Sequence, residues 1–126
     1  MNLMEATIFA ILVAGQPVQP GAQFGCLLAD DGKMAVCSND MGIREFADGT
    51  LEFDGRHKVS KNRRRELVFS TGITSHFDSF GWLQFSNGYA ARRLEGDMFR
   101  LAQPGGAPDL TCRYLRPGKQ TRCTPG

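Results

Sequence analysis

The sequence of 126 residues lacks the short motifs that mark the common catalytic and metal-dependent sites. It contains no glycine-rich phosphate loop, no EF-hand loop, no H-E-x-x-H and no G-x-S-x-G sequence. Its only two histidines, His57 and His76, have no framing that supplies a nucleophile and an orienting acid. We therefore predict no catalytic residues and no cofactor, and interpret the protein as non-enzymatic. A small hydrolase that uses one of the histidines remains an alternative.

Long apolar runs are also missing. The longest, residues 6–15, has ten residues and is too short to span a bilayer, so no membrane span is expected. Residues 1–15 have two interpretations. The run suits the apolar core of a signal peptide, although a basic leader is absent and Glu5 has the wrong charge. It also suits a first buried strand halted by Gly15, Pro17 and Pro20, which we favour slightly. Residues 16–126 are predicted to form a single all-β domain.

Zinc-like spacing is absent from the four cysteines, because structural zinc ligands come in pairs two to four residues apart. We therefore predict no metal site. Instead, Cys26 and Cys37 end one C-x10-C segment, and Cys112 and Cys123 end another. With Asp31-Gly32 and Pro117-Gly118 as two-residue hairpin loops, each pair would face across a hydrogen-bonded site with Cα atoms about 5.5 Å apart. That separation permits a disulfide.

Connectivity stays open at this point, since four cysteines allow three pairings and a bridge between distant strands is one of them. Any such bridge indicates an oxidising environment, in the periplasm, outside the cell or on a particle surface.

Turn-forming dipeptides divide most of the chain into short strands. X-Gly turns occur at residues 31–32, 48–49, 54–55, 87–88 and 117–118. As two-residue loops, they place Ala47 opposite Thr50 and Phe85 opposite Ala90. No stretch shows a sustained helical period. The pattern predicts an all-β fold: an antiparallel sandwich or barrel of short strands joined by X-Gly hairpins and stapled by disulfides.

Charge is divided unevenly along the chain. Residues 1–55 hold eight acidic and two basic residues, whereas residues 56–126 hold five acidic and thirteen basic ones. One charge run stands out, and it gives candidates for binding a polyanion or nucleic acid: Arg56, Lys58, Lys61, Arg63, Arg64 and Arg65. No aromatic residue interleaves it, which weakens the case for single-stranded nucleic acid. The simpler interpretation is a solvated hairpin tip.

A second candidate surface is aromatic. The predicted hairpin around Asn87-Gly88 places Trp82 opposite Arg93, a possible cation–π pair, with Phe80 on the same face and Tyr89 at the turn. If this face points outward, it has the composition of a protein-binding hot spot. If it points inward, Trp82 and Phe80 belong to the core.

Taken together, these features favour a binding or assembly module outside the reducing cytoplasm. It would be an inhibitor, an accessory subunit or a particle-surface component that presents loops and an edge strand to another protein. A homo-oligomer or larger assembly is equally compatible. Polyanion binding through residues 56–65 is the alternative.

Overall fold

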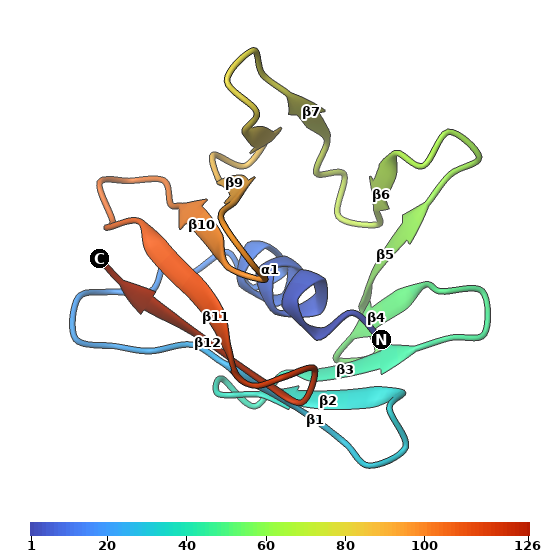
Figure 1. Ribbon diagram of the computed structural model, residues 1–126. Coiled ribbons are helices and arrows are strands. Elements are labelled where there is room, and N and C mark those ends of the chain that lie inside the picture. The colour runs from blue at the N-terminus through green and yellow to red at the C-terminus, as the bar shows by residue number, and fades with distance from the viewer.

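Twelve short strands form a single antiparallel sheet that curls around one helix (Figure 1). We describe a computed structural model of residues 1–126. The strands are β1 (Cys26–Leu28), β2 (Met34–Cys37), β3 (Gly42–Glu45), β4 (Leu51–Phe53), β5 (His57–Lys61), β6 (Leu67–Phe69), β7 (Ser75–Phe77), β8 (Leu83–Phe85), β9 (Ala90–Arg93), β10 (Phe99–Ala102), β11 (Leu110–Arg116) and β12 (Gln120–Pro125).

The sheet order shows how the barrel nearly closes. It runs β6-β5-β4-β3-β2-β1-β12-β11-β10-β9-β8-β7, so consecutive strands are paired everywhere except between β6 and β7, and β1 also pairs with β12. The two edges are β6 and β7, which follow one another in the chain. The all-β prediction is confirmed, in its barrel form.

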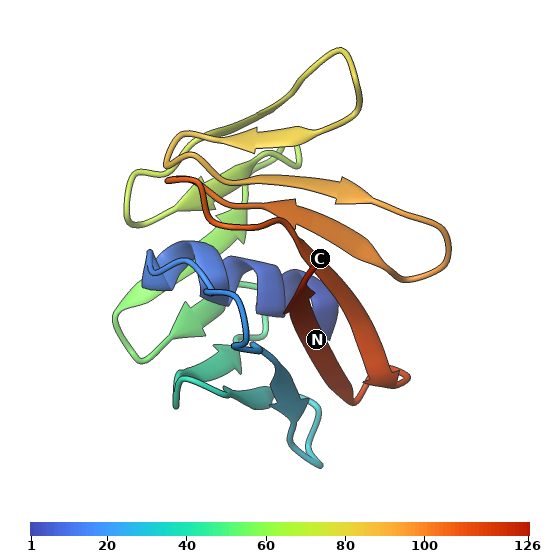
Figure 2. The same cartoon turned by 90° about the vertical axis from the view of Figure 1, so that its left-hand side faces the viewer.

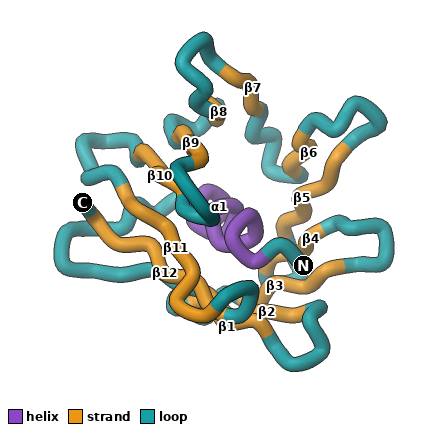
Figure 3. Tube along the Cα trace, viewed as in Figure 1, coloured by secondary structure: helices purple, strands orange, loops and turns teal.

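The helix α1 (Leu3–Ala14) lies inside the curl of the sheet, with strands on both sides in two perpendicular views (Figures 2 and 3). Asn2 caps its first turn by accepting from the Glu5 N–H, and Gly15 ends it in the left-handed conformation, with φ 69°. Nine of its twelve residues are buried. The prediction of a buried strand here is wrong. A helix surrounded by sheet is apolar on every side, so it shows no amphipathic period.

The signal-peptide interpretation of residues 1–15 stays a prediction. This helix is too short to cross a membrane, and no other helix is present.

The core lies between α1 and the inner face of the sheet. Its fully buried side chains include Phe53, Leu101 and Leu110. Phe69 makes edge-to-face contacts with Phe9 of α1, at 5.5 Å between ring centroids, and with Phe85 of β8, at 6.0 Å. These contacts join the helix to strands near both edges of the sheet.

Both disulfides are local: Cys26–Cys37 joins β1 to β2, and Cys112–Cys123 joins β11 to β12. The predicted cross-strand partners are confirmed. Their expected position in the ladder is wrong, because the Cα separations are 3.9 and 4.0 Å, as at non-hydrogen-bonded sites. In the first hairpin, the Ala29 N–H donates to the Met34 carbonyl, which makes a four-residue loop in place of the predicted two-residue one.

Two other hairpins differ from prediction by one residue of register. Phe46 donates its N–H to the Thr50 carbonyl, so Thr50 lies opposite Phe46, not Ala47. Likewise, the Phe85 N–H donates to Tyr89. Both loops contain three residues and end in a glycine of positive φ, 88° at Gly49 and 95° at Gly88. This is the type I turn with a bulge that follows the two-residue loop in frequency.

Candidate protein-binding cleft

The open side of the barrel lies between β6 and β7, each of which has one free edge. Antiparallel ladders alternate residues that bond to the neighbouring strand with residues that point away from it. The ladder between β7 and β8 includes a hydrogen bond from the Asp78 N–H to the Trp82 carbonyl. The backbone N–H and C=O groups of Ser75 and Phe77 therefore point away from β8, toward the opening.

The same reasoning applies to β6. The Asn62 N–H donates to Glu66 and the Ser70 N–H donates to Lys58 at the two ends of its ladder with β5. The backbone N–H and C=O groups of Leu67 therefore point away from β5, toward the opening. Two rows of unpaired backbone donors and acceptors thus line the opening.

Beneath this opening is a cavity of about 590 Å³. Ile8 and Phe9 of α1 line it, together with residues from both edge strands. Its other apolar lining residues are Leu67, Phe77, Leu83, Phe85, Ala91 and Phe99. Its charged lining is mixed: three basic residues, Lys61, Arg64 and Arg65, lie beside two acidic ones, Glu5 and Glu66, and His76 also lines it. Size and lining match those of sites that hold a small ligand or a large side chain.

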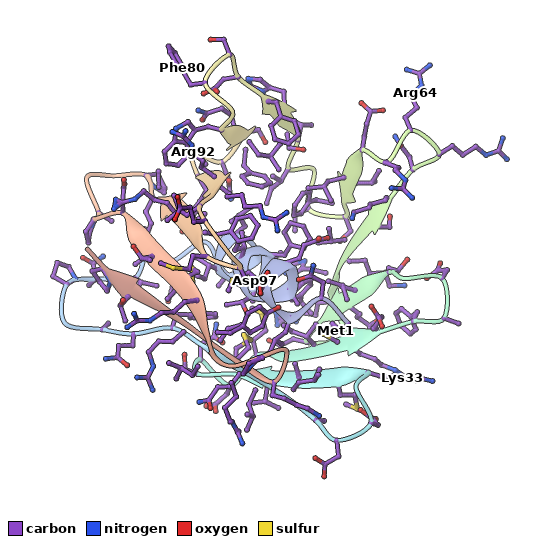
Figure 4. The ribbon with its side chains drawn as sticks, in the orientation of Figure 1. Met1, Lys33, Arg64, Phe80, Arg92 and Asp97 are labelled. Carbon is purple, nitrogen blue, oxygen red and sulfur yellow. A yellow bond between two sulfur atoms is a disulfide. The ribbon has the colours of Figure 1, made fainter.

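The β7–β8 hairpin exposes two phenylalanines. Phe77 and Phe80 are 72% and 77% exposed, more than any other large apolar residue in the protein. Phe77 lines the cavity, and Phe80 lies at the hairpin tip across the opening from Arg64 (Figure 4). Exposed aromatic side chains beside an open sheet edge are typical of a protein-binding surface.

Asp78 holds the tip that carries Phe80. Its Oδ1 accepts from the backbone N–H groups of Phe80 at 2.9 Å and Trp82 at 3.0 Å, and its Oδ2 accepts from Gln84 Nε2 at 3.0 Å. The hydrogen bond from Gln84, with those backbone donors and nearby His76, lowers the pKa of Asp78 below its ordinary value of 3.8. These three hydrogen bonds hold the turn, and they are stronger when Asp78 is ionised.

Of the predicted aromatic surface, only part faces solvent. Phe80 and Arg93 are exposed and Trp82 is half-buried, but Tyr89 is buried with 1% exposure. Burial also raises the pKa of Tyr89. The predicted Trp82–Arg93 facing pair is wrong, because Leu83 lies opposite Ala91. The cation–π contacts form elsewhere, from Arg44 and Lys58 to the Phe46 ring.

The structure separates the residues of the basic run. Arg56 lies in the turn before β5, whereas Arg63, Arg64 and Arg65 lie in the hairpin after that strand. The two lysines of β5 are engaged in separate contacts: Lys58 Nζ lies 5.7 Å from the centroid of the Phe46 ring, and Lys61 forms an ion pair with Glu5 at 3.3 Å. The run is therefore not one continuous patch.

Other chemistry has little geometric support. A second, more polar cavity of about 610 Å³ shares Glu5 and Lys61 with the first and is also lined by Glu45 and Asp48. No cluster of His, Cys, Asp and Glu is placed to hold a metal ion. Neither histidine side chain forms a hydrogen bond with a hydroxyl or a carboxylate.

Sequence reasoning missed Phe77 and the cavity. The signal for Phe77 was a large aromatic residue in a short polar strand, Ser75 to Phe77. Phe77 is exposed because β7 is one of the two edge strands. The edges fall at β6 and β7 only because β1 pairs with β12, which the sequence does not display.

Comparisons with protein-family models, curated proteins and solved structures found no match.

Proposed function

We propose that this protein is a non-enzymatic binding module that captures an extended segment of a partner protein in the cleft between β6 and β7. One observation carries the proposal: two free sheet edges flank an apolar cavity beside an exposed phenylalanine. A strand added to an edge gains backbone hydrogen bonds, and alternate side chains enter pockets and supply specificity.

The edge of β7 is the better acceptor. Edge strands are commonly protected by lysine, proline or inward-pointing charge, and β7 (Ser75–Phe77) has no lysine or proline. The edge of β6, by contrast, follows directly on the basic hairpin tip at Arg63, Arg64 and Arg65. We infer that the partner pairs with β7 and directs its charged residues toward that tip.

The segment that connects the two edges is long enough to leave room for one added strand. Strands lie about 4.8 Å apart, so one added strand requires β6 and β7 to be about 10 Å apart. Residues 70–74 join the two edges. A segment of that length reaches about 17 Å when extended. The connection therefore allows the required width without unfolding either edge.

Charge indicates the partner's composition. Arg64 and Arg65 line the cavity and form no ion pair within the protein, whereas Lys61 already pairs with Glu5. Acidic residues that alternate with apolar ones would meet these arginines while a large apolar side chain enters the cavity.

The two disulfides support a location outside the reducing cytoplasm. An inhibitor, an accessory subunit or a particle-surface component would each present such a cleft to another protein. In each case the partner supplies the strand.

The proposal is tested with a synthetic capped peptide, Glu-Val-Glu-Phe-Glu-Val-Glu, by isothermal titration calorimetry. We expect it to bind and to slow hydrogen exchange at the Ser75 and Phe77 amides. A copy that is N-methylated along its pairing edge should bind at least about tenfold more weakly, since it cannot donate to β7. Equal binding of the two peptides, or no binding by either, would contradict strand addition.

A matched pair of variants locates the site. Phe77→Ser removes the exposed ring beside the cavity and should weaken peptide binding. Val68→Ser makes a similar change at a residue of β6 that is 47% exposed but does not line the cavity, and should leave binding unchanged. If both variants bind alike, the peptide does not occupy this cleft.

A further inference from the structure

Four arginines form a continuous row on the outer face of the sheet. Arg92 of β9 lies directly opposite Arg100 of β10, and Arg113 of β11 lies directly opposite Arg122 of β12. Arg100 is also opposite Thr111, two residues before Arg113, so the two pairs are diagonal neighbours. Such neighbours are about 7–8 Å apart.

The row faces away from α1. The residues that alternate with these arginines, Ala91, Leu101, Cys112 and Cys123, are all buried on the inner face. Arg92 accordingly lies on the side of β9 away from the helix (Figure 4). All four guanidinium groups therefore belong to the convex surface of the barrel.

This arrangement is unfavourable unless an anion compensates it. Like charges directly opposite each other destabilise a strand pair. Only one carboxylate forms an ion pair with an arginine of the row and so reduces the repulsion: that of Asp109, which lies 3.6 Å from Arg100. Arg113 and Arg122 have no acidic partner in the protein. Two like-charged pairs in register thus point to an external polyanion.

We propose that this row, formed by Arg92, Arg100, Arg113 and Arg122, binds an anionic polysaccharide. Guanidinium groups bind sulfate and carboxylate oxygens through paired hydrogen bonds. The site is separate from the cleft between β6 and β7, and it goes beyond the proposed function because it needs no protein partner.

Shape and composition favour a polysaccharide over a nucleic acid. The outward positions of β9 to β12 in this region hold alanine, threonine and arginine, with no aromatic ring on which a base could stack. The face belongs to a curved sheet, and the only helix lies on the other side of that sheet, so no helix is presented to a major groove (Figure 1). The disulfides also favour an oxidising environment, and outside the cell anionic glycans are among the polyanions that such a row could meet.

Heparin, a sulfated polysaccharide, is a suitable probe, and neutral dextran is its uncharged control. The Arg113→Gln/Arg122→Gln variant should bind heparin at least about tenfold more weakly at low salt, with a reduced salt dependence. The control variant Arg56→Gln/Arg63→Gln removes the same charge from exposed residues outside the row. It should bind like the wild type.

Three results would overturn the proposal. One is an equal loss in both variants, which would mean that heparin responds to net charge alone. Another is tighter binding of a short DNA duplex than of heparin. The third is unchanged binding by the row variant. Phe77→Ser should retain heparin binding, so this experiment and the peptide experiment fail independently.

Discussion

The hydroxyl oxygens of Thr7 in α1 and Thr121 in β12 lie 2.7 Å apart in the buried interior. Thr7 donates its only hydroxyl proton to the Leu3 carbonyl at 2.7 Å, so it accepts the proton of Thr121. Thr121 in turn accepts from the Cys26 N–H at 3.1 Å. A directed chain of hydrogen bonds therefore runs from β1 through β12 to the helix.

The direction of this chain predicts unequal costs for two similar substitutions. Thr121→Val leaves the buried Cys26 N–H without an acceptor, and should lower the free energy of unfolding by about 1–3 kcal/mol. Thr7→Val should cost less, because the freed Thr121 hydroxyl can turn to the Cys26 carbonyl, 3.4 Å away. Denaturant unfolding of the two variants measures the difference. A larger loss for Thr7→Val would contradict the assigned direction.

Sequence reasoning predicted the fold where the constraints are local. The cysteine partners of both hairpins were predicted correctly because each pair lies at a fixed distance from a turn. The loops themselves are longer than the two residues predicted: four residues in the first hairpin, and three in the second, where Arg116 lies opposite Gln120. The register around Asn87-Gly88 was wrong by one residue, since an Asn-Gly pair fits either a two-residue loop or a three-residue loop with a bulge. Sequence alone does not separate these loops.

The helix and the cleft depend on contacts that sequence does not display. Residues 3–14 are apolar on every side because strands surround them, and that pattern resembles a buried strand as closely as a buried helix. The cleft exists because β1 pairs with β12, which leaves β6 and β7 as edges. That closure joins residues far apart in the sequence, such as Phe24 and Cys123.

Reduction of the disulfides should destabilise the barrel without changing its topology. Each bridge has a sequence separation of 11 residues. A loop of that length corresponds to about 3 kcal/mol in the chain-entropy model. The Cys26→Ala/Cys37→Ala variant should therefore unfold at lower denaturant concentration than the wild type but keep its β-rich circular-dichroism spectrum. If reducing agent left the wild type's midpoint unchanged, the bridges would contribute no stability.

Alanine substitutions at Phe69 and Phe77 should have very different effects on stability, because Phe69 belongs to the core and Phe77 to the proposed binding surface. Phe69 is 5% exposed and contacts Phe9 and Phe85, so Phe69→Ala should cost about 3–5 kcal/mol. Phe77 is 72% exposed, so Phe77→Ala should change stability by no more than about 0.5 kcal/mol. Thermal unfolding of both variants tests this contrast. A strongly destabilised Phe77→Ala variant would show that its ring packs against the fold.

Acid should loosen the tip that presents Phe80. The pKa of Asp78 is lowered in the folded protein, mainly by the hydrogen bond from Gln84. The stabilisation it provides is therefore present above its ordinary value of 3.8, and is lost as the pH falls through the lowered pKa. NMR titration of the Asp78 carboxyl group should give a midpoint below that value. Gln84→Ala should raise the midpoint, and an unchanged titration would assign the shift to another cause.

Relief of one like-charged pair in the arginine row should stabilise the free protein. In Arg113→Thr, the remaining Arg122 faces a neutral, strand-favouring residue, and we expect a gain of about 0.2–1 kcal/mol at low salt. The gain should shrink at high salt, where the repulsion is screened. Arg63→Thr, at an exposed hairpin tip, is the control for net charge.

Heparin should reverse the order of stability of the wild type and Arg113→Thr when both are measured by thermal unfolding. A ligand that binds only the folded state raises its melting temperature, and the wild type offers four arginines to the polysaccharide where Arg113→Thr offers three. Saturating heparin should therefore stabilise the wild type more than the variant. If Arg113→Thr were less stable than the wild type even without heparin, the row would be stabilising in itself, and its two opposed pairs would no longer indicate a missing polyanion.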